Sequence, residues 1–505
     1  ALTECVVSAA GTDVTLTAPR IDFAFSQDSL AVSADRLAAK EASLKFEAGL
    51  NDFAAPRLRL KAQGGAPLAL LAGYLPQGGE PQLGGVANVD LAVSGALAQP
   101  ERLNISGSLK VRDGSLRATT LPEQLERFTC DIGVAPKKIT INALSLQFER
   151  SDIALTGEIS DPFPYLLPVA DSTKEKFPGP YLQFTATSHH FDVDRLFPEA
   201  APGTGVNRAS MPLDSVPPIL LPEVNGAGVA TFDTLIYSEV QFTKVTSDVR
   251  IERTRIFCDN IRGTAYSGAV TGNTVIDLTE FDNPTYYGGF NAEQVSAAEV
   301  IQRFLGVNVG DYLAGKIKLS GDYSSSGWEP AEFLQALTMN VDAFGAGMEL
   351  RNAPLTNQWI ESLVQTTGKT QLRDKYRTIS LKSFQGAFKM EKGRIVVNDL
   401  AGEAASLGSW KLSGGMGLDG ALDLGGSFVP SQQLISELAG DNALAGALAE
   451  YLKDPASGQI SAPLTVRGTV EKPVAHLDMS VVQSKIGEAM KKQAGDALKG
   501  LFKKR

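Results

Sequence analysis

The feature that most constrains the fold of this chain is an alternation of apolar and polar residues with a period of two. Between Gly85 and Gly95, Val89, Leu91 and Val93 alternate with polar or small residues. Successive side chains of a β-strand point to opposite faces, so this alternation predicts strands with one buried face and one solvated face.

The same alternation recurs along nearly the whole chain. It is found in residues 103–106, 109–112, 245–251, 316–320, 338–344, 421–424, 464–470 and 474–479. Turn signals separate many of these runs, and Asp113-Gly114 is expected to be such a turn. We therefore predict a mostly β fold. It is an elongated, curled antiparallel β-sheet forming a repeating β-groove, with a few inserted amphipathic helices and a C-terminal helix.

A weak internal repeat supports a sheet built from similar units. In Ser94–Pro100 and in Arg467–Pro473, a glycine ends a strand and a proline closes the loop that follows; Ser320–Pro330 is a longer version. Glycine permits a tight bend or bulge, and proline blocks further pairing on that edge. Repetition of such units builds a quasi-one-dimensional sheet rather than a globule.

Helical segments are few. Ser296–Glu299 has the sequence of a capping box, and apolar residues follow it at helical spacing as far as Gly306. Residues 354–366 and 431–453 also have amphipathic patterns, and residues 67–75 could form one short apolar helix or turn.

The expected domain organisation follows from changes in composition. Residues 198–222 are rich in Pro, Gly and Ser, which is typical of a loop or linker. We predict an N-terminal β-groove segment at residues 1–200, a linker or loop at 201–225, a second β-groove region with inserted helices at 226–480, and a basic amphipathic helix at 481–505.

This last segment carries seven basic residues and two acidic ones between residues 480 and 505, whereas the whole chain has a net charge of −10. A basic amphipathic helix is typical of contact with an anionic membrane surface. The alternative is a terminal helix that docks on the sheet with solvated lysines. The membrane-surface candidates are Val482, Ile486, Lys491, Lys492, Leu498, Leu501 and Phe502.

Composition and motifs exclude several classes of function. The acidic net charge argues against nucleic-acid binding, which needs a basic surface. No run of 18 or more apolar residues is present to span a bilayer. The chain begins Ala1-Leu2-Thr3 without a methionine, which is consistent with removal of a signal peptide or an anchor.

The sequence also lacks the patterns of a catalytic or metal site. His189, His190 and His476 do not form HExxH, and neither GxSxG nor a P-loop occurs. The pair Asp192 and Asp194 is expected to be a charged strand or loop face rather than a general acid and base. The glycines of residues 414–417 predict a strand kink. We expect no enzyme activity, no metal and no cofactor.

Three cysteines, Cys5, Cys130 and Cys258, are far apart and show no CxxC spacing. We expect three buried thiols, with one disulfide plus a free thiol as the alternative. The cysteines therefore do not assign a compartment.

An ordered series of short motifs resembles the AsmA-like family of bacterial envelope proteins, best over residues 281–480. The segment His190–Pro198 resembles the family's D-x-D-R-φ-φ-P passage. The other matching segments are residues 290–306, with a helix-inserted repeat, 313–321, with a Gly-bounded strand, 386–395, with an F-x-x-x-x-G-x-φ hairpin, and 465–473, with the closing GT-φ-x-x-P.

The resemblance implies a periplasmic protein anchored to the inner membrane and related to the TamB-like group and to eukaryotic chorein-type bridge proteins. These families present a curled β-sheet with an apolar trough and are implicated in moving phospholipids between membranes. The N-terminal transmembrane helix of the family is missing from this sequence. Anchoring through such a helix, or through the basic C-terminal segment, is the corresponding expectation.

A one-sided amphipathic sheet must cover its apolar face or present it to another apolar partner. We therefore predict a non-enzymatic protein whose groove binds phospholipid acyl chains and supports lipid transfer between the inner and outer membranes. A periplasmic scaffold that recruits envelope proteins and assists outer-membrane assembly is the alternative, and a β-solenoid glycan-active enzyme is third. The groove candidates, each of which could instead be ordinary core, are Val89, Leu91, Val93, Ile105, Leu109, Val111, Val245, Val249, Ile251, Ile317, Leu319, Met339, Val341, Leu422 and Leu424.

Overall fold

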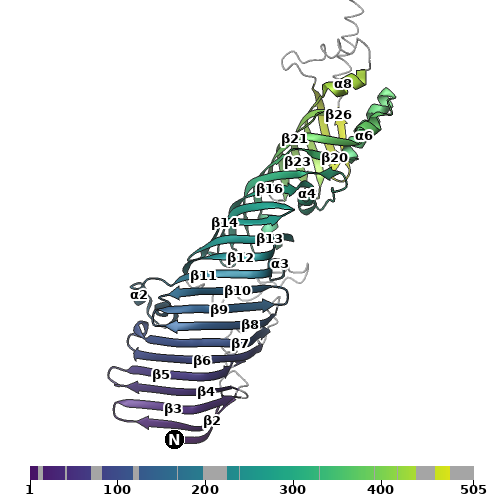
Figure 1. The fold of residues 1–505 in the computed structure, drawn as a ribbon. Helices are drawn as coiled ribbons and strands as arrows, with labels where there is room; N and C mark the ends of the chain where they lie inside the picture. The colour runs from purple at the N-terminus through teal and green to yellow at the C-terminus, as the bar shows by residue number, and fades with distance from the viewer. Residues whose placement is uncertain are drawn as a thin grey trace, which may run out of the picture. The chain divides into compact units, whose positions relative to one another are not determined.

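The computed structural model is mostly β, with 68% of residues in strands and few helices (Figure 1). It describes residues 1–8, 15–39, 42–69, 82–117, 124–167, 169–196, 224–237, 239–328, 330–391, 393–417, 419–439 and 461–477. The predicted fold class, a mostly β chain with a curled antiparallel sheet and a few inserted helices, is confirmed, and the sheet is not closed on itself.

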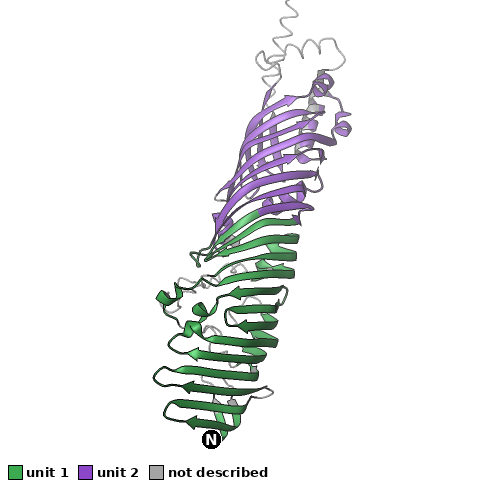
Figure 2. Ribbon diagram, turned by 60° about the vertical axis from the view of Figure 1, so that its left-hand side comes forward, with its two compact units in different colours: residues 1–263, 273–284, 328–330 green, residues 264–272, 285–327, 331–505 purple. Residues whose placement is uncertain are grey.

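Two compact units divide the chain (Figure 2). Unit 1 contains residues 1–263, 273–284 and 328–330, and unit 2 contains residues 264–272, 285–327 and 331–505. Both strands that flank the predicted linker at 201–225 belong to unit 1, and residues 197–223 lie outside the described residues.

In unit 1, consecutive strands pair edge to edge from β1 to β13. The strands are β1 (Leu2–Ser8), β2 (Thr15–Phe25), β3 (Ser29–Ala39), β4 (Ala42–Asn51), β5 (Arg57–Pro67), β6 (Gln82–Ala96), β7 (Asn104–Arg117), β8 (Leu125–Ala135), β9 (Lys138–Phe148), β10 (Asp152–Ser160), β11 (Tyr181–Asp192), β12 (Asn225–Tyr237) and β13 (Val240–Glu252). The strands β14 (Arg255–Ala265) and β15 (Gly268–Asp277) contribute residues to both units.

One pairing in unit 1 departs from the predicted antiparallel sheet, because β11 and β12 run parallel. A parallel pair cannot be joined by a tight turn and needs a long crossover connection. The chain between α3 (Val193–Leu196) and β12 supplies that length, and it contains the stretch predicted to be a Pro- and Gly-rich loop. Among the described strand pairs of unit 1, the prediction of antiparallel pairing is therefore wrong only between β11 and β12.

In unit 2 the main strand order is β16, β18, β19, β21, β22, β23, β24, β25, β26, and every pair is antiparallel. Their bounds are β16 (Thr285–Ser296), β18 (Lys316–Ser326), β19 (Thr338–Gly345), β21 (Thr378–Glu391), β22 (Arg394–Ala404), β23 (Gly408–Gly417), β24 (Ala421–Pro430), β25 (Ala462–Thr469) and β26 (Pro473–Leu477). The short strands β17 (Leu313–Ala314) and β20 (Met348–Arg351) pair with each other, and β20 also pairs with the start of β21.

The helices of the described residues differ between the units. Unit 1 has short turns only: η2 (Pro100–Arg102), α1 (Phe163–Leu166), α2 (Asp171–Lys174) and α3. The helices α4 (Ala297–Leu305), α6 (Pro354–Thr367), α7 (Leu372–Lys375) and α8 (Gln432–Ala439) lie in unit 2, and α5 (Pro330–Ala336) lies there except for its first residue.

The predicted capping box of α4 is confirmed. The Ser296 side chain accepts a hydrogen bond from the Glu299 N–H, and Gly306 ends the helix in the left-handed conformation at φ 68°. The helix predicted at 354–366 is α6, and the predicted glycine kink at 414–417 lies inside β23. Of the helix predicted at 431–453 only α8 is described, and most of residues 67–75 and the whole C-terminal helix lie outside the described residues.

The predicted turn at Asp113-Gly114 is wrong, because β7 continues through both residues. Asp113 adopts φ 51°, and the register with β8 shifts between Val111 and Gly114. An extra residue that bends a strand without ending it is a β-bulge, and its local sequence is that of a turn.

Candidate functional site

Register places the apolar residues of unit 1 in continuous rows that cross the strands. Residues paired directly across neighbouring strands point to the same face. The first row runs from β3 to β13 through Ala34, Phe46, Ala62, Leu91, Gly107, Val134, Ile139, Ile159, Leu182, Gly226 and Ile251. Every position in this row is apolar or glycine.

A second row lies beside the first, two residues away along each strand except β3, where a bulge makes the spacing three. It runs through Leu37, Leu44, Gly64, Val89, Leu109, Ile132, Ile141, Gly157, Phe184, Gly228 and Val249. This row also contains only apolar residues and glycine. A third row follows from β6 to β13, through Ala87, Val111, Cys130, Leu144, Leu155, Ala186, Ala230 and Ser247. We call the surface formed by these rows the apolar face of unit 1.

The opposite face of the same strands is polar. The row displaced by one residue from the first row runs through Lys45, Gln63, Asp90, Ser108, Gly133, Thr140, Glu158, Gln183, Ala227 and Arg250. Cross-strand ion pairs lie on this face, such as Lys138 Nζ with Glu158 Oε2 at 2.8 Å. The strands of unit 1 therefore align their apolar residues on one common face of the sheet and most of their polar residues on the other.

A second polar-face ion pair joins Lys110 Nζ to Asp131 Oδ2 at 2.9 Å, and Asn142 donates to the other carboxylate oxygen at 3.2 Å. Hydrogen bonds from Lys110 and Asn142 hold the pKa of Asp131 below its usual value. These groups are exposed, so the pairs help to fix register and contribute little to stability.

Much of the apolar face is only half-buried. Val89, Leu91 and Leu109 retain partial solvent exposure, although each lies in the middle of its strand. Towards β2, the same face is openly exposed, at 50% for Phe23 and 78% for Phe25. Because these aliphatic side chains lie at the centre of the sheet and are still half-buried, the described residues do not fully cover this face.

Glycines allow neighbouring strands to approach closely on this face. A Cβ atom at Gly107 would lie 1.8 Å from the Asp90 carbonyl oxygen, and one at Gly64 would lie 2.2 Å from the Ser43 oxygen. Both residues also have positive φ, at 145° and 133°. No other residue type fits these positions without displacing the backbone.

Within the described part of unit 1, two clusters bring residues from outside the strands onto the apolar face. Phe163 of α1, which is 7% exposed, forms one cluster with Leu103 and Ile105. The half-buried residues that pack against this cluster are Leu91, Val93, Val134, Ile139 and Leu167. In the other cluster Leu68, 5% exposed, packs with Ala87, Val111, Leu109, Phe128 and Cys130. The Leu68 cluster reaches the second row at Leu109, and the Phe163 cluster includes Leu91 of the first row.

In unit 2, helices cover one side of the sheet. Ile360 and Val364 of α6, Leu372 of α7 and Leu434 of α8 pack in one cluster with strand residues such as Ile379. The buried members of this cluster are nearly inaccessible, with Ile379 1% and Leu372 2% exposed. This is an ordinary packed core between a sheet and its helices.

The structure separates the predicted groove residues into two groups. Nine lie on the apolar face of unit 1: Val89, Leu91, Val93, Ile105, Leu109, Val111, Val245, Val249 and Ile251. In unit 2, Ile317, Leu319, Met339, Leu422 and Leu424 belong to packed clusters, and Val341 is half-buried opposite Phe388. The seven membrane-surface candidates, residues 482–502, lie outside the described residues.

Several residues of the rows were missed by reading the sequence alone. Ile132, Ile139, Ile141 and Phe184 occupy the centre of the apolar face but were not predicted as groove residues. Bulges explain part of the omission, since the register of β8 and β9 shifts between Asp131 and Ile132. A bulge reverses the phase of the alternation, so one strand no longer reads as a single pattern.

The histidine and aspartate motif lies where β11 extends beyond β10. The Asp152 carboxylate accepts hydrogen bonds from the backbone N–H of His190 at 2.8 Å and of His189 at 3.1 Å, and it contacts the His189 ring at 3.1 Å. Asp192 accepts from the Arg195 N–H and caps α3, and Asp194 accepts from the Glu239 N–H at 2.6 Å. These carboxylates therefore satisfy backbone donors at the crossover.

The described cysteines form no disulfide. Cys5, Cys130 and Cys258 are unpaired and half-buried, and burial raises the pKa of Cys130 and Cys258. Groups of three or more His, Cys, Asp or Glu that could hold a metal are absent from the described residues. Helices able to cross a membrane are likewise absent from them.

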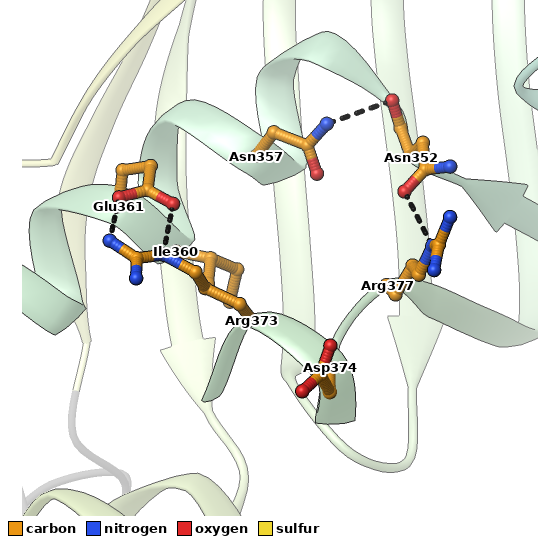
Figure 3. Close-up of a pocket in the computed structure, with 7 residues that line it drawn as sticks. All are labelled: Asn352, Asn357, Ile360, Glu361, Arg373, Asp374 and Arg377. Carbon is orange, nitrogen blue, oxygen red and sulfur yellow. Dashed lines mark hydrogen bonds and ion pairs between the residues drawn. The ribbon is translucent and has the colours of Figure 1, made fainter. Parts of the chain in front are cut away.

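A polar hollow of about 240 Å³ in unit 2 is lined by seven residues near α6 and α7 (Figure 3). Arg373 is held by two hydrogen bonds to Glu361, at 2.6 and 2.7 Å, and Arg377 donates to the Asn352 side chain at 3.2 Å. Asn357 donates to the Asn352 carbonyl oxygen at 3.0 Å. Its charged groups serve to hold α6 and α7 together, and none of its residues pairs a nucleophile with a base.

Comparisons with protein-family models, with curated proteins and with solved structures find no match. The candidate site therefore rests on the arrangement of the chain's own residues, and the apolar face of unit 1 is the strongest candidate.

Proposed function

We propose that this protein is a non-enzymatic lipid-binding protein whose apolar face in unit 1 holds phospholipid acyl chains. The observation that carries the proposal is the composition of the first and second rows, in which every position from β3 to β13 is apolar or glycine. In a protein core, a row of exclusively apolar residues is expected because other side chains cover it. Here Val89, Leu91 and Leu109 remain half-buried.

The energetics favour hydrocarbon as the occupant. Each methylene group that moves from water onto an apolar surface gains roughly 0.8 kcal/mol, so two acyl chains supply ample binding energy. Neighbouring strands lie about 4.8 Å apart, so a row that crosses β3 to β13 offers a path of roughly 50 Å. The contacts are non-directional, which predicts weak selectivity for the headgroup.

The resemblance of the motif series to AsmA-like proteins supports the same function. It adds the proposal that the protein is periplasmic, is anchored to the inner membrane in its full form, and supports phospholipid transfer between the inner and outer membranes. The polar face, with its exposed ion pairs, suits contact with water on the other side of the sheet. A scaffold that recruits envelope proteins is the alternative.

Gently purified protein analysed by native mass spectrometry tests the proposal, with phospholipid adducts as the expected result. Val249→Asp, in the second row, is expected to reduce adducts at least about tenfold, because a carboxylate placed against hydrocarbon loses several kcal/mol of hydration. Thr246→Asp is the matched control, since Thr246 is exposed on the polar face of the same strand.

Val89→Asp and Asn88→Asp repeat the comparison on β6, where the two neighbours lie on opposite faces. Lipid adducts that persist in both apolar-face variants contradict the assignment of the groove. A wild-type protein that carries no lipid but retains envelope proteins favours the scaffold instead.

A further inference from the structure

Four apolar side chains of unit 1 gather where two neighbouring hairpins turn. Phe25, the last residue of β2, is 78% exposed, more than any other large apolar residue of the described chain. Phe53, in the turn between β4 and β5, is 40% exposed and stacks on Phe25 with 6.1 Å between the ring centroids. Phe23 is 50% exposed and Leu30 37%. We call these four residues the aromatic tip.

The two turns that carry the aromatic tip are bound to each other. The Asp52 N–H donates to the Asp28 carbonyl oxygen at 2.8 Å, and the Ala55 N–H donates to the Asp52 carboxylate at 3.1 Å. Both turns, residues 26–28 and 52–56, lie in the described part of the chain, whereas the undescribed connections 9–14, 40–41 and 70–81 leave the opposite ends of these strands. The connections at this end therefore leave the tip uncovered.

The aromatic tip is continuous with the apolar face. Register aligns Phe25 with Leu30, Leu50 and Leu58, and it aligns Phe23 with Val32, Ala48, Leu60, Val93 and Ile105. The row through Phe23 lies two residues from the first row along β4, β5 and β6. An uninterrupted apolar surface therefore joins the tip to the first row.

The size of the aromatic tip favours a bilayer over a folded protein as its partner. An aromatic side chain presents about 150–250 Å² in full, so at their observed exposures the four residues present roughly 400 Å². Each partner in a stable protein–protein interface buries about 800 Å². Half of that area is too small for such an interface, but lipids mould around an inserted side chain, and each buried phenylalanine strengthens binding about tenfold or more.

Two arginines directly behind the tip suit the phosphate layer of a bilayer. Arg57 and Arg59 begin β5, and both are exposed. The residues that pair with them on β4 and β6 are uncharged: Asn51, Ala96, Gly49 and Ser94. Asp28 and Asp52 lie in the turns and balance this charge, so we expect the rings to contribute more to binding than the arginines do.

We propose that the aromatic tip docks on the surface of a phospholipid bilayer, with the rings of Phe25 and Phe53 among the acyl chains and with Arg57 and Arg59 at the phosphates. Only the purpose of this contact rests on the proposed function: docking brings the acyl chains of the bilayer to the end of the apolar face, so lipid passes between the two without crossing water. The contact belongs to the β2–β5 hairpins themselves and is separate from the C-terminal segment.

Flotation of the full chain with phosphatidylcholine vesicles tests the docking, because these vesicles carry no net charge to attract the basic C-terminal segment. Phe25→Ser is expected to lower the partition coefficient about tenfold, and Phe25→Ser combined with Phe53→Ser about a hundredfold. Phe344→Ser is the matched control, since Phe344 of β19 in unit 2 is 49% exposed, and it leaves binding unchanged.

Phe25→Trp measures insertion directly. Vesicles are expected to shift the fluorescence of the introduced tryptophan to shorter wavelengths, and brominated acyl chains are expected to quench it, relative to the wild-type protein. Phe344→Trp is the control and shows neither change. Arg57→Gln combined with Arg59→Gln is expected to lower binding about fivefold per arginine when the vesicles contain phosphatidylglycerol.

Vesicle binding that survives the combined Phe25 and Phe53 changes overturns the docking site, and so does a wild-type protein that does not bind vesicles. A dimer that these changes dissociate, in the absence of vesicle binding, also overturns it and assigns the tip to a second copy of the chain. Failure of the proposed function is a separate result: a protein that binds vesicles through the tip but carries no phospholipid adducts supports the docking and refutes acyl-chain binding by the apolar face.

Discussion

Unit 1 and unit 2 are built from the same kind of strand, but their apolar residues are buried to different extents. In unit 2, helices α4, α6, α7 and α8 pack on the sheet, and Val295, Ile379 and Tyr376 are no more than 1% exposed. In unit 1 the described helices are single turns, and the residues at the centre of the second row remain half-buried.

The difference teaches that strand pattern alone does not distinguish a core from a binding surface. Alternation places apolar residues on one face in both units, and inserted helices then determine whether that face becomes a dry interior. Nothing in Ile317-Lys318-Leu319 differs in kind from Val89-Asp90-Leu91. Ile317 is buried in the core cluster of unit 2, whereas Val89 on the apolar face of unit 1 stays half-buried.

The largest expected effect is on the stability of unit 2. Ile379→Ala removes a fully buried side chain and is expected to cost about 2–5 kcal/mol, whereas Leu109→Ala in unit 1 is expected to cost roughly half as much or less. Hydrogen exchange of the β21 and β7 amides in the full chain measures both losses. Equal losses at the two positions would mean that the apolar face of unit 1 is a core after all.

A smaller effect is expected where α8 is held over the sheet of unit 2. The Tyr376 hydroxyl group donates to Glu437 Oε2 at 2.8 Å, and Lys375 and Gln433 also bind this carboxylate. Burial, together with this hydrogen bond, raises the pKa of Tyr376, so the phenol stays protonated and donating.

Tyr376→Phe keeps the ring in the core and is expected to cost about 1.5 kcal/mol, a low value for a hydrogen bond to a charged group because Glu437 keeps its other partners. Faster hydrogen exchange in α8 is the predicted signature, with Ser436→Ala on the same helix as the control. Unchanged hydrogen exchange in α8 would show that apolar packing through Leu434 alone holds α8 on the sheet.

The smallest effect concerns pH and the crossover in unit 1. Burial alone would raise the pKa of Asp152, but hydrogen bonds from His190 and His189 outweigh it and lower that pKa. The hydrogen bond to Asp152 raises the pKa of His189, and the charges of Asp152 and Asp233 add to the shift. A lowered carboxyl pKa stabilises the folded state above the unfolded value and is lost as the pH falls through the folded value.

A raised imidazole pKa stabilises the folded state below the unfolded value, and that contribution is lost as the pH rises through the folded value. The His189 and His190 amides, which bind Asp152, are therefore expected to be most protected from hydrogen exchange between about pH 4 and pH 6.5. These limits are the unperturbed pKa values of the two groups. Hydrogen exchange at the His189 and His190 amides, corrected for intrinsic rates, measures this. His189→Gln should remove the decline above neutral pH but keep the acidic one.

Local signals of the sequence predicted individual elements well. Ser296 and Gly306 bracket α4 because a side-chain acceptor and a left-handed glycine satisfy the ends of a helix within a few residues. Asp113-Gly114 misled for the same reason, since a turn and a bulge use the same left-handed residues. The parallel pairing of β11 and β12 left no local signal, because it depends on a long connection.

The sequence by itself determined that this chain forms strands with one apolar side, because the period of two follows from backbone geometry and needs no distant contacts. It also placed nine of the groove candidates on a shared face of unit 1. Only the tertiary structure decided which part of that apolar side is covered. Register across bulges, the helices of unit 2 and the placement of Phe163 are long-range outcomes, set by packing between residues that are far apart in the chain.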